Sequence, residues 1–166
     1  NTMIKASVPY KDEDLLPVAL IALAPSMIVV PHTSKYQNLK EFIEASKNGN
    51  GFNFATAGSG STPHFVAEIL NVKYGAKLQP VPYKSGSEST TAVMGGQVEG
   101  TSEASIIALP HILHDGKFKA LATTWTQRLS AYPQLPTAIE QGYPEVKIAH
   151  WAGVHAPKGT PPEIMD

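Results

Sequence analysis

The sequence predicts an α/β fold with a mostly parallel sheet that carries helices on both faces. First, 166 residues that are 42% hydrophobic are enough to bury a sizeable core. Second, short β-branched or aromatic runs alternate with segments whose apolar residues recur at helical spacing. Third, 13 glycines and 14 prolines separate these segments into short units. Such alternation is typical of parallel strands joined by helical crossovers.

The first units are two strands, each followed by a helix. Residues 27–30 form a β-branched run closed by Pro31, which predicts a buried strand. Residues 38–47 place Leu39 and Phe42 on one helical face and end at a glycine-rich turn. A second strand is expected at 52–56, and a second helix begins after a glycine-rich loop, with Thr62 as its N-cap and Pro63 at its first position.

The later units continue the alternation. Strands are expected at 77–83, 97–102 and 119–124, and helices at 87–94 and 105–114. Pro80 and Pro82 indicate that the strand at 77–83 lies at a sheet edge. The remainder is expected to form a proline-bearing loop at 128–136, a short helix at 137–141 and a strand at 146–156, before a new segment opens at Pro157.

Composition excludes several classes of site and partner. A formal net charge of -1 gives no whole-chain signal for nucleic acid, so no nucleic-acid partner is expected. The absence of cysteine excludes disulfides, thiol nucleophiles and zinc–thiolate sites. The longest apolar stretch, 18–30, is interrupted by Pro25 and is shorter than a membrane span of ~20 residues. The first residues show no signal-peptide pattern, so any such peptide is expected to lie outside this sequence.

The loop from Thr56 to His64 is the strongest candidate for a binding site. A strand that leads through a glycine-rich turn into a helix directs backbone N–H groups and the positive helix end to one point, which suits an anion. The alternative is a solvent-exposed turn with a good N-cap. The candidate ligand-binding residues are Thr56, Gly58, Ser59, Gly60, Ser61, Thr62 and His64. Neither the phosphate-loop pattern nor the third glycine of a dinucleotide fingerprint is present, so a carboxylate fits better than a nucleotide.

Two further loops are expected at the same edge of the sheet. Tyr83, Lys84, Ser85 and Gly86 follow one strand, and Ser102 and Glu103 follow another. Ligands of α/β folds bind at the carboxyl ends of such strands. Lys84 adds a cation or is simply a solvated lysine. Glu103 orders water, meets an amino group of the ligand, or caps the next helix.

Catalytic and metal-binding patterns are weak. The sequence has no G-x-S-x-G or H-E-x-x-H motif. His111 and His114 share a predicted helix without an evident third ligand. We therefore expect no catalytic residues, no metal and no cofactor. The alternative is a flavodoxin-like enzyme domain that uses the glycine-rich loop for phosphate or a phosphosugar.

Ordered motifs along the chain resemble one known family. These motifs are Val81-Pro82-Tyr83-Lys84, Gly96-Gln97-Val98-Glu99, the segment 116–122, and Arg128 followed by Leu135-Pro136-Thr137. In order and spacing they resemble the substrate-binding receptors of tripartite tricarboxylate transporters, often called Bug receptors. The resemblance implies a periplasmic-binding-protein-like (type II) fold and a non-enzymatic, periplasmic receptor. Such a receptor closes two domains around a small carboxylated molecule and delivers it to a membrane permease.

The resemblance also implies a domain organisation and roles for the candidate residues. Residues 27–148 look like a complete second domain, whereas 1–26 and 149–166 look like crossover strands with parts of a first domain. The loop 56–64 looks like the second-domain carboxylate clamp, and residues 83–86 and 102–103 look like cleft walls. The family commonly has Asp followed by Asn where this chain has Glu103-Ala104, so the ligand stays open. Dimerisation by exchange of the end segments is a further expectation.

Overall fold

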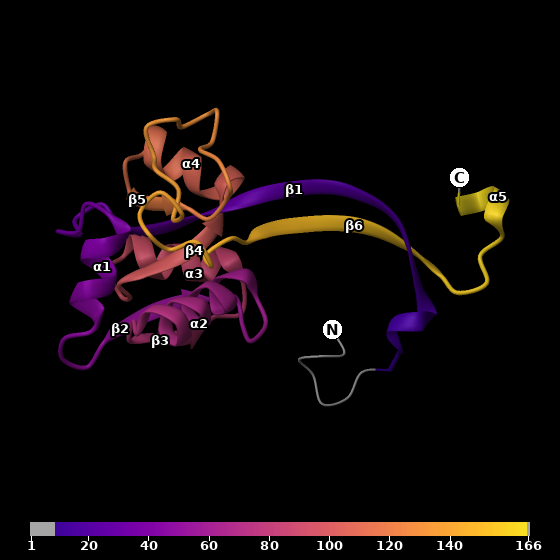
Figure 1. Ribbon diagram of the computed structural model, residues 1–166, viewed down its shortest axis with the longest axis horizontal. Helices are drawn as coiled ribbons and strands as arrows, with labels where there is room; N and C mark the ends of the chain where they lie inside the picture. Colours follow the sequence, from indigo (N-terminus) through magenta and orange to yellow (C-terminus); the bar gives the residue numbers. More distant parts are fainter. Residues whose placement is uncertain (1–8, 166) are drawn as a thin grey trace. The chain divides into compact units, whose positions relative to one another are not determined.

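The computed structural model describes residues 9–165 and divides into two compact units (Figure 1). One unit is Ala24–His150, and the other combines Asn1–Leu23 with Trp151–Asp166. Strand β1 (Leu15–Pro31) contributes residues to both units. The Ala24–His150 unit contains the sheet and all of the candidate binding residues, so it is described first.

A central sheet organises the Ala24–His150 unit. The strands besides β1 are β2 (Phe52–Thr56), β3 (Leu78–Pro82), β4 (Gly100–Ala104) and β5 (Phe118–Thr123). They lie in the order β3-β2-β4-β1-β5. Strand β2 is parallel to β3 and β4, whereas β1 runs antiparallel between β4 and β5. The predicted α/β fold is confirmed, with β1 as the reversed strand.

Helices cover both faces of this sheet. They are α1 (Leu39–Ser46), α2 (Thr62–Tyr74), α3 (Gly86–Met94) and α4 (Ser105–Leu113). Successive residues of a strand point to opposite faces, and β1 shows this directly. Ile28 joins a buried cluster with Phe42 of α1 and Leu70 of α2. Met27 joins a second cluster with Val93 of α3 and Ala108 of α4. We call these two sides the α2 face and the α3 face.

The fold brings three loop–helix junctions to one edge of the sheet. Strands β2, β3 and β4 point in the same direction, and each is followed by a helix. The N-termini of α2, α3 and α4 therefore all start from the edge where these strands end, which we call the carboxyl-end edge. Glycine-rich turns and β-strand ends at such an edge are where α/β proteins bind ligands.

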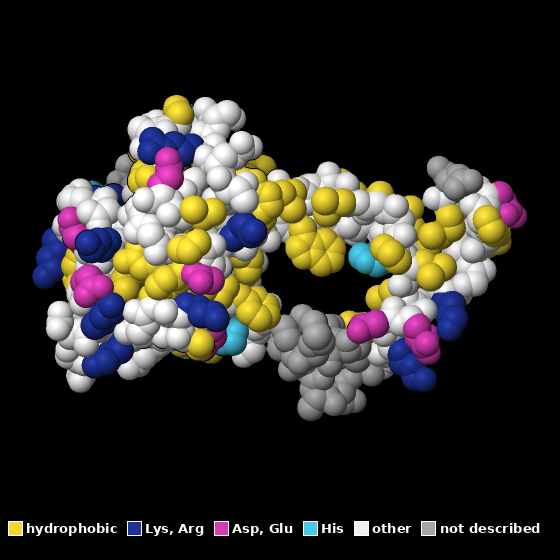
Figure 2. All heavy atoms as spheres, in the orientation of Figure 1, with side chains coloured by type: hydrophobic (Ala, Val, Ile, Leu, Met, Phe, Trp, Pro, Cys, Tyr) yellow, Lys and Arg dark blue, Asp and Glu magenta, His cyan; other side chains and the backbone are white. Residues whose placement is uncertain are grey.

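The other unit contains the first half of β1 together with β6 (Ala149–Pro157), a short 3-10 helix (Asp12–Asp14) and α5 (Pro162–Met165). Strand β6 pairs with β1. Apolar side chains gather on this two-stranded ribbon (Figure 2), and they include Ile21, 67% exposed, and Trp151, 64% exposed. Contiguous exposed apolar surface is typical of a surface that another part of a protein covers.

Two sequence predictions were wrong in detail. Residues 137–141 form successive hydrogen-bonded turns rather than a helix. Thr137 and Glu140 bond each other's backbone N–H groups as at a helix start, but Gly142, with a φ of 94°, ends the segment before a helix can form. The strand expected at 97–102 lies at Gly100–Ala104, because the Gln97 N–H bonds back to the Ala92 carbonyl and closes α3. Glu103 consequently lies within β4 rather than after it.

Candidate functional site

The N-terminus of α2 presents backbone donors at the carboxyl-end edge. Ser61, not Thr62, is the N-cap, and no side chain caps the first turn. Pro63 has no N–H, and among the described residues nothing accepts a hydrogen bond from the N–H groups of Thr62 and His64. The helix dipole adds positive potential at this point. The geometry therefore suits an acceptor that approaches from solvent.

The loop before α2 is held in shape by its own hydrogen bonds. Gly58 and Gly60 adopt φ angles of 96° and 78°, which favour glycine. The Ser61 hydroxyl donates to the Gly58 carbonyl at 2.7 Å, and the Gly60 N–H donates to His64 Nδ1 at 3.2 Å. The neutral His64 ring then carries its proton on Nε2 and can still donate from there. Ser59 is exposed and makes no contact that shapes the loop.

Two buried hydroxyls lie on the α2 face beside this loop. Ser102 pairs in register with Ile28 and therefore faces α2, and Ser26, two residues before Ile28, faces the same way. Both side chains are fully buried, and neither hydroxyl has a hydrogen-bond partner among the described residues. A buried, unpaired hydroxyl is unfavourable unless water or a ligand meets it. Thr56, on the adjacent strand, instead directs its hydroxyl to the Val81 carbonyl at 3.5 Å.

The turn between β3 and α3 is capped from within. The Ser85 hydroxyl accepts the Glu88 N–H at 3.2 Å, and the Glu88 carboxylate accepts the Lys84 N–H at 3.1 Å. Lys84 is exposed. Gly86 is the first residue of α3, and a Cβ added there would lie 3.7 and 3.8 Å from the two carboxyl oxygens of Glu103. The turn thus brings α3 against Glu103.

Glu103 is the one candidate whose electrostatics are strongly altered. It pairs in register with Met27, so it points to the α3 face, and its side chain is only 4% exposed. Burial raises the pKa of the Glu103 carboxyl to about 7, opposed in part by the hydrogen bond from the Ala104 N–H. Strongly perturbed acids are enriched at functional sites.

Sequence reasoning missed Ser26 and His150. The His150 Nε2 is buried without a partner among the described residues, and burial lowers the pKa of this ring. Ser26 is the polar residue within an otherwise apolar run, which was the available signal. His150 offered no signal in the sequence. Its position depends on a contact between distant segments, since the Ile148 N–H donates to the Thr124 carbonyl just after β5.

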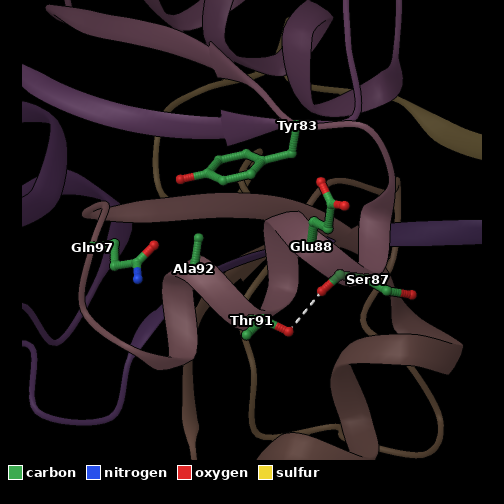
Figure 3. Close-up of a pocket in the computed structure, with 6 residues that line it drawn as sticks. All are labelled: Tyr83, Ser87, Glu88, Thr91, Ala92 and Gln97. Atoms are coloured by element: carbon green, nitrogen blue, oxygen red, sulfur yellow. Dashed lines mark hydrogen bonds between the residues drawn. The ribbon is translucent and has the colours of Figure 1, made fainter.

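Tyr83 faces a different part of the unit. Its ring lies over α3 and lines a cavity of about 380 Å³ together with Ser87, Glu88, Thr91, Ala92 and Gln97 (Figure 3). Of the predicted binding residues, only Tyr83 lines this cavity. A smaller cavity of about 220 Å³ includes Pro31 and Glu99, at the opposite edge of the sheet, and contains none of them.

The described residues contain neither a metal-binding cluster nor a membrane-spanning helix. Across residues 9–165, no three His, Asp or Glu side chains come together as a metal site. No described helix is long and apolar enough to span a membrane.

Comparison with known proteins identifies the family. The pattern of the tripartite tricarboxylate transporter family receptor matches residues 2–166. The chain belongs to this family. The resemblance of the ordered motifs to Bug receptors is thereby confirmed, and it extends over nearly all of the sequence.

Individual relatives agree with this family. Protein BugT of Bordetella pertussis is 35% identical over 161 residues, which cover 96% of this chain and 49% of that protein. MatC of Rhodopseudomonas palustris with bound malate has a TM-score of 0.87 at 27% identity and covers 98% of this chain and 55% of the other. R. palustris Rpa4515 with adipate has a TM-score of 0.89 at 27% identity, with the same coverage. The chain spans about half the length of the curated relatives it matches.

Proposed function

We propose that this receptor-family chain is the part of a periplasmic solute-binding receptor that holds one end of a small organic acid. The whole receptor would capture the acid without chemical change and deliver it to the membrane permease of a tripartite transporter. The single observation that carries the proposal is the uncapped N-terminus of α2 beside the buried, unpaired Ser102 hydroxyl. Malate and adipate, bound in two similar structures, support a carboxylate as the ligand.

The proposed contacts follow from the carboxyl-end edge. One carboxylate accepts the Thr62 and His64 N–H groups at the positive end of α2, and the Ser102 hydroxyl donates to the same group or to a water beside it. Ser59 and the His64 Nε2–H supply further donors around it, while Ser61, whose hydroxyl donates to the Gly58 carbonyl, holds the loop in shape. The glycine-rich loop lets the ligand approach the backbone closely because Gly58 has open space where a Cβ would stand.

A second domain would complete the receptor. We propose that residues 27–148 form the complete second domain, with 1–26 and 149–166 as crossover strands and parts of the first. The exposed apolar side chains of the β1–β6 ribbon support this, since a first domain would cover them. A ligand that contacts both domains favours the closed arrangement through its differential affinity.

An enzyme that binds phosphate is the rival hypothesis. The glycine-rich loop could also hold a phosphate, but the family match over residues 2–166 supports the receptor. Inorganic phosphate therefore belongs in the ligand panel as the test of the rival.

The experiment is ligand titration of the full-length gene product by thermal shift and calorimetry. The panel contains malate, adipate, the uncharged adipic diamide and inorganic phosphate. We expect an acid to raise the melting temperature and the diamide to have no effect, because only the acid uses the helix dipole. Selective stabilisation by phosphate would support the enzyme, and no response to any organic acid would refute the receptor.

A matched pair of variants locates the site. Ser102→Ala removes the hydroxyl at the carboxyl-end edge, and we expect a loss of affinity of about 10-fold or more, as for a hydrogen bond to a charged group. Ser46→Ala removes another fully buried serine hydroxyl, which bonds the Ile43 carbonyl and the Lys77 N–H far from that edge. Affinity should be unchanged in the Ser46 variant. Equal losses in both variants would show that the effect is structural.

A further inference from the structure

Glu103 performs none of the structural roles that usually justify burying a carboxyl group. Helix α4 has Ala104 as its N-cap and no side-chain cap, so Glu103 does not cap the next helix. Helix α3 is capped by Ser85 with Glu88. No Lys, Arg or His forms an ion pair with Glu103 among the described residues. Its identified hydrogen-bond donor is the N–H of the next residue, Ala104.

The position of Glu103 adds a second observation. It lies in the central strand β4, one residue beyond Ser102, at the edge where α2, α3 and α4 begin. Both carboxyl oxygens lie beside Gly86, the first residue of α3, where a longer side chain would compete for space. The α2 donors lie on one face of the sheet and the Glu103 carboxyl on the other, but both lie at the carboxyl-end edge. An organic acid that spans this edge can therefore meet the α2 donors at one end and the Glu103 carboxyl further along.

We propose that Glu103 is a specificity-determining residue that binds the organic acid in its protonated form, donating its O–H to a ligand oxygen, so that ligand binding takes up one proton from solvent onto ionised Glu103. This inference rests on the proposed function, since it requires an anionic ligand at the carboxyl-end edge. The step breaks no covalent bond of the ligand. The proton moves from buffer to the carboxylate, and the resulting O–H is the donor.

Charge balance supports the protonated form. Two like charges in one desolvated site cannot both stay ionised at low cost, and one proton shared between them relieves the repulsion. The unliganded carboxyl already has a pKa of about 7, so protonation near neutral pH costs little. An adjacent anion raises the pKa of Glu103 further, which links ligand affinity to pH.

The neighbouring titratable groups have other partners or positions. Glu88 and Lys84 face solvent on the β3–α3 turn, and the Glu88 carboxylate accepts the Lys84 N–H. The ionisable residue of α4 is His111, which pairs with Asp115 at 2.8 Å beyond the end of that helix. His64 stands at the start of α2 on the other face. The segments of β1 and β2 beside Glu103 carry no ionisable side chain.

The test measures malate or adipate binding to the full-length gene product between pH 6.0 and 8.5, with a probe that the proposed-function panel shows to bind. For a carboxyl of pKa about 7 that must be protonated, affinity should fall about 30-fold from pH 6.0 to pH 8.5. Calorimetry at pH 8.0 in two buffers of different ionisation enthalpy should show uptake of close to one proton per ligand. Malate loses its own last proton below this range, so above pH 6.5 any change of affinity with pH comes from groups of the protein.

Two variants assign the effect to Glu103. Glu103→Gln keeps a neutral donor of similar shape, so it should bind the probe with an affinity that is flat over this pH range and without proton uptake. Glu99→Gln makes the same chemical change at the opposite edge of the sheet, where the carboxylate accepts the Asn53 N–H at 2.8 Å, and should keep the wild-type pH dependence.

Each contrary result has a distinct meaning. Affinity that rises with pH and collapses in Glu103→Gln would overturn the proposal, because the ionised carboxylate would then be the form that binds the probe. Affinity that is independent of pH in the wild type would overturn it by removing Glu103 from the ligand. A pH dependence that survives in Glu103→Gln would assign the proton to another group, His64 first. If no organic acid binds at any pH, the proposed function itself fails.

Discussion

In the absence of ligand, the Glu103→Gln variant should become more stable relative to the wild type as pH rises from acid to alkaline. The folded carboxyl has a pKa of about 7 against an ordinary value of 4.5. Between these values the folded state binds more protons than the unfolded state, so the free energy of unfolding falls as pH rises through this window. The contribution of the Glu103 carboxyl to the free energy of unfolding is fully present below pH 4.5 and is lost as pH rises through 7. A difference of about 2.5 pKa units corresponds to about 3 kcal/mol.

Urea denaturation of wild type and Glu103→Gln at pH 5.0 and pH 8.0 measures this effect. The buried amide has its own pH-independent cost, because its NH₂ group needs partners, so the informative quantity is the change of the difference with pH. We expect the variant to gain about 2.5 kcal/mol on the wild type between the two conditions, because at pH 5.0 the unfolded carboxyl is already largely ionised.

Other groups with shifted pKa values contribute equally to wild type and variant, so they do not affect this comparison. Hydrogen bonds from His111 and Arg128 lower the pKa values of Asp115 and Glu140, so both favour folding at neutral pH and lose that contribution in acid, equally in both proteins. Glu99→Gln is the control and must retain the wild-type loss at alkaline pH. If the difference between Glu103→Gln and wild type is the same at both pH values, Glu103 is not a desolvated acid and the reasoning is refuted.

Three further predictions concern the scaffold that holds the site. Gly100→Ala should destabilise the chain by about 1–3 kcal/mol in urea denaturation, because the added Cβ would lie 2.9 Å from the Val29 carbonyl oxygen in the centre of the sheet. Asn71→Ala should cost about 2–3 kcal/mol by the same measurement, because its amide both donates to and accepts from the buried backbone of Leu78, at 2.8 Å each. Gly58→Ala should cost about 1–2 kcal/mol in thermal and urea unfolding through its left-handed backbone alone, since its Cβ would meet nothing within 4 Å.

Controls for these variants come from similar positions. Gly95→Ala adds a Cβ at ordinary contact distance, 3.4 Å or more, with a φ of -80°, and should change stability by under about 0.5 kcal/mol. Lys73→Ala alters an exposed residue of the helix that carries Asn71 and should be similarly mild. If Gly100→Ala is as mild as Gly95→Ala, the close approach of β1 and β4 is wrong. If Asn71→Ala matches Lys73→Ala, its two hydrogen bonds contribute nothing.

The sequence was informative wherever local chemistry determines structure. Glycine and proline mark the ends of helices, so α1, α2 and α3 were located to within a few residues. The alternation of strand-like and helical segments predicted the order of the strand–helix units, and therefore the edge of the sheet at which the loops meet. The Arg128 guanidinium bonds the Glu140 carboxylate and the Pro133 carbonyl, and so it holds the loop after β5. These features depend on neighbours that are close in sequence.

The parts that could not be predicted depend on pairing between distant segments. The reversed direction of β1 follows from its insertion between β4 and β5, and no local pattern encodes that neighbour choice. The position of the Ser26 hydroxyl could not be predicted either, because it lies on the α2 face only through the pairing of Ser26 with Ala104. Tyr83 was expected to line the cleft from its place in a loop, yet its ring packs along α3, and its role in binding stays a prediction.

Glu103 shows how the two kinds of information combine. A strand ending one residue earlier would have left its carboxylate in solvent, as an ordinary surface acid or a helix cap. Because β4 extends through Ala104, the side chain is instead enclosed between β1 and α3, where it has no counter-charge among the described residues. A fold that retains an uncompensated acid at this point sacrifices stability. Since glutamine has nearly the same shape and would avoid that loss at neutral pH, stability alone cannot explain the acid, and its ability to exchange a proton can.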